Sequence, residues 1–136
     1  MDTNGTARAI IAEISNVLSL VDAKQAASFV DALVRAERVF VFGEGRSGLV
    51  ARAFAMRLMQ MEAEAYVVGE TTTPAIAKDD LLVAVSGSGE TPSTVLFADN
   101  ARGVGAQIAA VVADAGTKLA AGADVALVIP ARRRAA

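Results

Sequence analysis

The chain has 136 residues, of which 54% are hydrophobic, and its formal net charge at pH 7 is −2. This length predicts a single domain over residues 1–136, the composition excludes a disordered chain, and the charge gives no reason to expect nucleic acid as a partner. The sequence contains neither cysteine nor histidine, which excludes disulfides, thiolate catalysis and the commonest metal ligand, so we expect no metal and no cofactor.

The N-terminal part of the chain is predicted to be helical over about residues 5–36. Its start lacks the basic and apolar regions of a signal peptide, and no run of about 18 apolar residues indicates a membrane span, so we expect a cytoplasmic protein without membrane contacts. Two apolar stripes at helical spacing are separated by Asp22, which is placed to cap the second helix with Gln25 as its capping-box partner. The stripes consist of Ile10, Ile11, Ile14, Val17, Leu18 and Val21, and of Ala26, Phe29, Val30, Leu33 and Val34.

The rest of the chain alternates short apolar runs with helical patterns. The runs predict strands at 39–42, 66–68, 81–85, 108–112 and 125–129, and such uninterrupted runs are typical of parallel strands covered on both faces. Helices are predicted between them, from about residue 47 to 61, from 91 to about 103, and for one or two turns within 116–121. The first of these carries its larger apolar residues on one face: Val50, Phe54, Leu58 and Met61.

This alternation predicts an α/β fold, a three-layer sandwich around a five-stranded parallel sheet in the flavodoxin-like order 2-1-3-4-5. In that order the first and third strands are neighbours, and the chain leaves them in opposite directions. Ligands bind beyond the carboxyl ends of the strands at such a point. The loops after the first and third strands are therefore expected to meet at one site.

The loop after the third predicted strand, residues 86–91, reads Ser-Gly-Ser-Gly-Glu-Thr. Ser86, Ser88 and Thr91 each offer a hydroxyl, Gly87 lets the backbone approach a ligand, and Thr91-Pro92 is a typical helix start. Backbone N–H groups and the positive end of a helix dipole favour an anion here. A plain turn capped by Thr91 is the alternative, but so many donors after one buried strand favour an anion site.

The loop after the first predicted strand, residues 43–48, reads Gly-Glu-Gly-Arg-Ser-Gly. Gly45 gives backbone access, Arg46 can clamp a phosphate or sugar oxygen, and Ser47 adds a hydroxyl. A dinucleotide site is the alternative, because the three glycines partly match the glycine spacing of the dinucleotide-binding fingerprint. Glu70 also lies near the position at which that fingerprint has an acidic residue that contacts the ribose. However, the third glycine comes one residue early and bulky residues stand where the helix begins. The two loops together therefore favour a phosphorylated small molecule.

Three glutamates, Glu44, Glu70 and Glu90, lie on loops at the predicted ligand end of the sheet. Without histidine, proton transfer at neutral pH would require a carboxylate. Glu70 is the strongest candidate because it lies in the longest loop, followed by three threonines and a proline. The charged residues at 78–80 are expected to be solvated in a turn.

At these loops the sequence resembles the sugar isomerase (SIS) domain family, and within it most resembles the 6-phospho-3-hexuloisomerases. The stretches that carry the resemblance are VFVFGEGRSGLVARAFAMRLM, YVVGETTTP and LLVAVSGSGET, and the likeness runs from about Ile10 to Pro130. It implies the SIS fold and isomerisation of 3-hexulose 6-phosphate to fructose 6-phosphate, a step in formaldehyde fixation through ribulose monophosphate. It also implies a phosphate held by Ser47, Ser86, Ser88 and Thr91, and a sugar site lined by Gly45, Arg46 and Glu70.

The sequence departs from this family at two places. Family members generally continue past the fifth strand into a helix with a glutamate placed as the catalytic base, whereas this sequence stops at Ala136, so we expect that helix to be absent. They also often have histidine within 57–61, where this sequence has Gln60. We therefore expect a weak isomerase in which Glu70 and Arg46 are catalytic, or a non-catalytic phosphosugar-binding module that senses or regulates. A homodimer or homotetramer is expected, because the first apolar stripe lies outside the minimal α/β unit.

Overall fold

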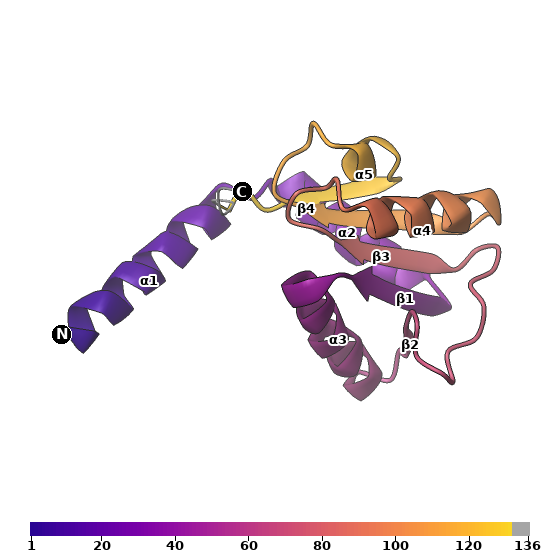
Figure 1. Cartoon of the computed structure of the whole chain (residues 1–136), viewed down its shortest axis with the longest axis horizontal. Helices are drawn as coiled ribbons and strands as arrows, with labels where there is room; N and C mark the ends of the chain where they lie inside the picture. The colour runs from indigo at the N-terminus through magenta and orange to yellow at the C-terminus, as the bar shows by residue number, and fades with distance from the viewer. Residues whose placement is uncertain (132–136) are drawn as a thin grey trace.

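The computed structural model describes residues 1–131, which form two N-terminal helices followed by five strands (Figure 1). The helices are α1 (Thr3–Ser19), α2 (Ala23–Arg35), α3 (Gly45–Gln60), α4 (Pro92–Gly103) and α5 (Lys118–Ala121). The strands are β1 (Arg38–Gly43), β2 (Glu64–Val67), β3 (Leu81–Val85), β4 (Gln107–Val112) and β5 (Val125–Val128). A helix follows β1, β3 and β4, whereas a loop without a helix joins β2 to β3.

The five strands form one sheet in the order β2-β1-β3-β4-β5, and all neighbouring strands are parallel. This confirms the predicted α/β fold and strand order. After β1 the chain crosses to β2 at one edge, and it then returns to place β3 on the other side of β1. The carboxyl ends of β1 and β3 therefore lie side by side where the chain changes direction, which is the predicted ligand position.

Three strands begin one or two residues before their predicted starts, at Arg38, Glu64 and Gln107. These first residues are polar, so a search for apolar runs does not include them. They belong to the sheet because their backbone pairs with a neighbouring strand; Arg38, for example, is in register with Glu64. Helix α3 likewise begins at Gly45, two residues before its predicted start.

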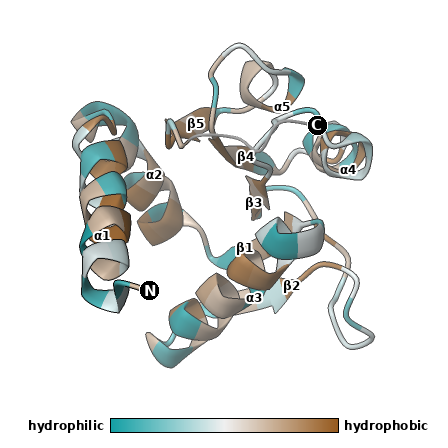
Figure 2. Ribbon diagram, turned by 60° about the vertical axis from the view of Figure 1, so that its left-hand side comes forward, coloured by the Kyte–Doolittle hydropathy of each residue, from teal (hydrophilic) through white to brown (hydrophobic). Residues whose placement is uncertain are grey.

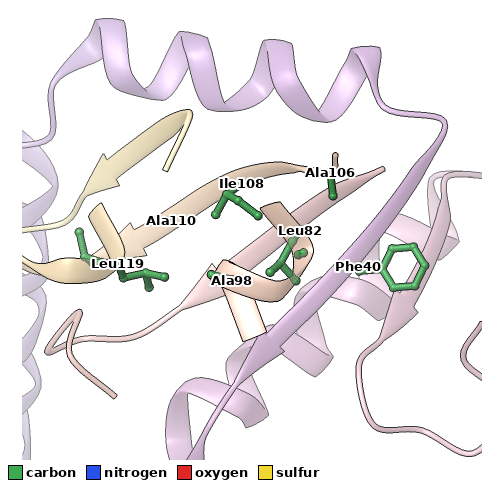
Figure 3. Close-up of a cluster of buried hydrophobic side chains, with 10 residues drawn as sticks. Phe40, Leu82, Ala98, Ala106, Ile108, Ala110 and Leu119 are labelled. Carbon is green, nitrogen blue, oxygen red and sulfur yellow. The ribbon is translucent and has the colours of Figure 1, made fainter. Parts of the chain in front are cut away.

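Helices cover both faces of the sheet, and Figure 2 shows the hydrophobic strands β3, β4 and β5 between them. Because side chains alternate along a strand, Val39 and Val41 of β1 face α2 and α3, while Phe40 faces the opposite layer. Figure 3 shows the cluster of buried side chains on the Phe40 side of the sheet, in which Leu82 and Ile108 lie against α4 and α5. Each face of the sheet therefore has its own hydrophobic core.

Helix α3 buries only part of the predicted face, since Leu58 is buried and Phe54 is half-buried as predicted, but Val50 and Met61 are not. Ala51, Ala55 and Leu58 are buried, whereas Val50 is 63% exposed and Met61 is 64% exposed. Small alanine side chains allow the helix to approach the sheet closely, and the larger side chains of the strands fill the space between them. Helix α4 follows the same pattern, with alanines and a threonine as its buried residues.

The N-terminal helices differ in how they contact the sheet. Helix α1 projects away from the sandwich and has no buried residue (Figure 1). Helix α2 begins as predicted, since Asp22 accepts the N–H groups of Lys24 and Gln25. The predicted capping box is wrong, because the Gln25 side chain accepts the N–H of Val128 at 3.0 Å and so attaches α2 to the edge strand β5. Within residues 1–131, no helix is long and apolar enough to cross a membrane.

Candidate functional site

The two glycine-rich loops lie next to each other at the carboxyl edge of the sheet. The last residue of β1, Gly43, is in register with Val85, the last residue of β3, so both loops start from the same level. Across the gap between them, the Ser93 hydroxyl of α4 donates a hydrogen bond of 3.0 Å to the Glu44 carboxylate. The structure therefore brings together two segments that are about 40 residues apart in the sequence, as their topology predicts.

Three hydroxyl groups converge in the loop between β3 and α4. The Ser86 oxygen lies 2.8 Å from that of Thr91 and 3.4 Å from that of Ser88, and Ser88 and Thr91 are 3.5 Å apart. The buried Ser86 also accepts the Gly89 N–H at 3.0 Å, which fixes the turn. A Cβ atom at Gly87 would meet no heavy atom within 4 Å, so the backbone is open on that side. We refer to Ser86, Ser88 and Thr91 as the hydroxyl cluster.

The hydroxyl cluster stands at the N-terminus of α4. Thr91 occupies the N-cap position, as predicted, but its side chain makes no capping hydrogen bond and contacts Ser86 instead. The first backbone N–H groups of a helix have no partner within the helix, and together with the helix dipole they favour an anion. The hydroxyls and this helix start can therefore hold a phosphate group together.

The loop between β1 and α3 is shaped by close backbone contact. A Cβ atom at Gly48 would lie 2.5 Å from the Gly43 carbonyl oxygen, so only glycine permits this approach of α3 to the end of β1. Gly45 has a φ of +55°, which favours glycine, and begins the helix. Arg46 is exposed and Ser47 half-buried in the first turn of α3. Both residues are therefore at the carboxyl edge of the sheet, as predicted.

The three candidate glutamates have different partners. Glu70 forms an ion pair with Arg52 of α3, and both side chains are largely exposed. Glu90 accepts the backbone N–H of Lys118 at 3.1 Å, which places its carboxylate at the start of α5. Glu44 is hydrogen-bonded to Ser93 between the two loops. Of these three candidates, Glu44 is thus the one whose hydrogen bond joins the β1–α3 loop to the start of α4.

Glu70 lies beside an open hollow of about 480 Å³ between the β2–β3 loop and α4. Phe40, Thr73, Ile76 and Phe97 also line this hollow, and most of its surface is apolar. The hydroxyl cluster does not contribute to this lining as far as the described chain shows. The structure therefore places Glu70 at the ligand edge of the sheet, but it does not bring its carboxylate into contact with the cluster.

Sequence reasoning missed one charged residue that holds the β2–β3 loop. Asp80, predicted to be solvated, is only 5% exposed and accepts a bidentate hydrogen bond from Arg38, with Nε 2.9 Å from Oδ1. It also accepts the Ala77 N–H at 2.7 Å, and Arg38 donates to the Ala75 carbonyl. Hydrogen bonds from Arg38 and Ala77 hold the pKa of Asp80 below its ordinary value, against the opposing effect of burial. The signal in the sequence was that two residues of opposite charge, Arg38 and Asp80, stand at the starts of the adjacent strands β1 and β3, where they can form an ion pair.

The chain is similar to several known proteins. The 3-hexulose-6-phosphate isomerase of Mycobacterium gastri is 44% identical over 122 residues, covering 90% of this chain and 61% of that protein. The crystal structure of a Methanococcus jannaschii hypothetical protein, inferred to be a 3-hexulose-6-phosphate isomerase, matches with a TM-score of 0.80 and 36% identity. The match covers 91% of this chain and 74% of the Methanococcus jannaschii chain. The structure of the Vibrio vulnificus NanR protein, complexed with ManNAc-6P, matches with a TM-score of 0.82 and 25% identity. The match covers 95% of this chain and 50% of the NanR chain.

These relatives are longer than the chain described here. It spans 66%, 49% and 61% of three curated relatives that are 41–47% identical to it. A model of the SIS domain family matches residues 32–136, which include both glycine-rich loops and the whole sheet. The chain therefore belongs to the SIS domain family.

Proposed function

We propose that the chain binds a phosphorylated sugar and takes part in the interconversion of 3-hexulose 6-phosphate and fructose 6-phosphate. The hydroxyl cluster at the N-terminus of α4 carries this proposal, because three hydroxyls within 3.5 Å of each other can surround one phosphate. The isomerase names of the relatives from Mycobacterium gastri and Methanocaldococcus jannaschii support the choice of substrate. A cytoplasmic location remains a prediction.

The residues of the two loops divide between phosphate and sugar. In this proposal Ser86, Ser88, Thr91 and Ser47 donate hydrogen bonds to the phosphate, while Gly45 and Gly87 leave the backbone open to it. The exposed Arg46 guanidinium reaches a phosphate or sugar oxygen. In this proposal the ion-paired Glu70 and Arg52 contact the carbon chain of the six-carbon sugar phosphate.

The proposed reaction moves a carbonyl group between adjacent carbons. A base removes a proton from the hydroxyl-bearing carbon, the carbonyl oxygen takes up a proton, and the resulting enediol collapses with the two roles exchanged. With no histidine in the chain, a carboxylate supplies the base, and we assign this role to Glu70. Arg46 stabilises the negative charge that develops on the enediol oxygen.

Calorimetry with fructose 6-phosphate tests the phosphate site. Each hydrogen bond to a charged group is worth about 1.5–3 kcal/mol, so Ser88→Ala is expected to weaken binding roughly ten- to a hundredfold. Ser28→Ala is the matched control, since this exposed serine of α2 lies at the opposite edge of the sheet, beside Leu81 and Gln107. Equal affinity for unphosphorylated fructose would refute the phosphate assignment.

A non-catalytic sensing module is the second candidate, favoured by the similarity to NanR, whose structure contains a sugar phosphate. A coupled assay that follows fructose 6-phosphate formation from 3-hexulose 6-phosphate separates the two. Turnover that falls at least about a hundredfold in Glu70→Gln, with binding preserved, supports the enzyme. Binding without any turnover in the wild type supports the sensor.

We also propose that the chain is a homodimer or homotetramer in which α1 contacts a second copy. Ile10, Ile14 and Leu18 recur along α1 and are 53%, 53% and 59% exposed. A single helix of this length is only marginally stable in water, and exposed apolar residues at helical spacing favour pairing with another surface. A second copy supplies that surface with two-fold symmetry.

A further inference from the structure

Glu44 differs from the other two glutamates at the carboxyl edge of the sheet. Arg52 neutralises the charge of Glu70, and Glu90 is directed to the backbone of α5. Glu44 and Glu90 both have neutral partners, so neither charge is compensated by an ion pair found within residues 1–131, but of the three only Glu44 joins the start of α3 to the start of α4. The Glu44 charge stands between the N-termini of α3 and α4, where an anion is expected to bind.

A carboxylate beside a phosphate site has two opposite effects on ligands. It repels any anion, and in a partly exposed site this repulsion weakens binding of a bare phosphate by a modest factor. It also accepts hydrogen bonds from hydroxyl groups, and such charge-assisted bonds are about twice as strong as neutral ones. A ligand with hydroxyls near its phosphate gains from the second effect, whereas inorganic phosphate experiences mainly the first.

We infer that Glu44, held by Ser93, is a specificity-determining residue that favours phosphosugars over other phosphate anions. It accepts hydrogen bonds from sugar hydroxyls next to the phosphate, and it penalises anions that lack them. Its position supports this role: Glu44 is the N-cap residue of α3 yet makes no side-chain capping bond, and reaches instead across to α4. The inference rests on the proposed phosphosugar function and assigns the selectivity of that same site.

The test compares two ligands in the full chain. Calorimetry gives the dissociation constant for fructose 6-phosphate, and displacement titrations give that for inorganic phosphate even when it binds weakly. We define the selectivity ratio as the Kd for inorganic phosphate divided by the Kd for fructose 6-phosphate. Glu44→Gln is expected to lower this ratio roughly tenfold, because fructose 6-phosphate binds more weakly while inorganic phosphate binds more tightly. Ser93→Ala is expected to lower the ratio at least about twofold, since it releases the carboxylate from its position.

Glu90→Gln is the matched control, because it removes the same charge from the neighbouring loop while its amide oxygen can still accept the Lys118 N–H. Its ratio is expected to stay within about twofold of the wild-type value. A ratio unchanged in Glu44→Gln or in Ser93→Ala, or an equal fall in Glu90→Gln, overturns the assignment to Glu44. Wild-type protein that binds fructose 6-phosphate no more tightly than inorganic phosphate overturns the phosphosugar function itself, and the two failures are thereby distinguished.

Discussion

The ion pair between Arg38 and Asp80 is expected to be the most important single polar interaction for the stability of the sheet. Asp80 accepts three hydrogen bonds, two from Arg38 and one from Ala77, and its side chain is only 7% exposed. It connects the start of β1 to the start of β3 and closes the long β2–β3 loop. Asp80→Ala removes these bonds and leaves a cavity at this corner of the sheet.

The expected cost follows from what remains after the change. Hydrogen bonds to charged groups contribute about 1.5–3 kcal/mol each, and removing one partner of a buried ion pair costs about 3–5 kcal/mol. Here the Arg38 side chain is 25% exposed and Ala77 is exposed, so water reaches both groups once Asp80 is gone. We therefore expect a loss of about 2–4 kcal/mol in the free energy of unfolding, or a fall of roughly 10 °C in Tm.

Urea denaturation at fixed protein concentration measures this loss. The control is Asp99→Ala, which breaks an exposed Asp–Arg pair on α4 and is expected to cost at most about 0.5 kcal/mol. A loss below about 1 kcal/mol for Asp80→Ala, or equal losses for both variants, would refute the reasoning from burial.

The lowered pKa of Asp80 adds a dependence on pH. Because the folded protein holds this pKa below its unfolded value of about 4, the stabilisation is complete above that value and is lost as the pH falls through the folded pKa. The gap in unfolding free energy between wild type and Asp80→Asn is thus expected to be constant near pH 6–7 and to shrink below about pH 4. A gap that widens toward acidic pH would contradict the assignment.

Two further predictions concern the first loop and the assembly. Gly48→Ala is expected to lower the free energy of unfolding by about 1–3 kcal/mol, because its Cβ would collide with the Gly43 carbonyl. Gly103→Ala is the control, and it is expected to be neutral or slightly stabilising because the space beside Gly103 is open. Chemical denaturation compares the two variants, and equal losses would contradict the packing argument. Light scattering is expected to give two or four times 13.9 kDa for the wild type and a smaller mass for Ile14→Glu. The control Val104→Glu changes a similarly exposed residue beyond α4 and is expected to keep the wild-type mass. A monomeric wild type would exclude pairing through α1.

The sequence alone determined the order of strands and helices and the place where the loops meet. Apolar runs such as residues 81–85 are long enough and β-rich enough to predict buried strands without tertiary information. Their alternation with helices leaves few topologies, and in this one the loops after the first and third strands converge. The hydroxyls of Ser86, Ser88 and Thr91 could be predicted as one site because they lie within six consecutive residues of a single turn.

Only the tertiary structure decided which residues are buried and which charges are paired. Helical spacing favours large apolar residues as the packed face, yet α3 buries two alanines beside Leu58 and leaves Val50 exposed, because the distance between helix and sheet is set by the fit of both surfaces. Arg38 is 42 residues from Asp80, and Ser93 is 49 residues from Glu44, so no local pattern identifies these side-chain pairs. Charged residues on loops look alike in a sequence, and their roles depend on which other segments the fold brings within hydrogen-bond distance.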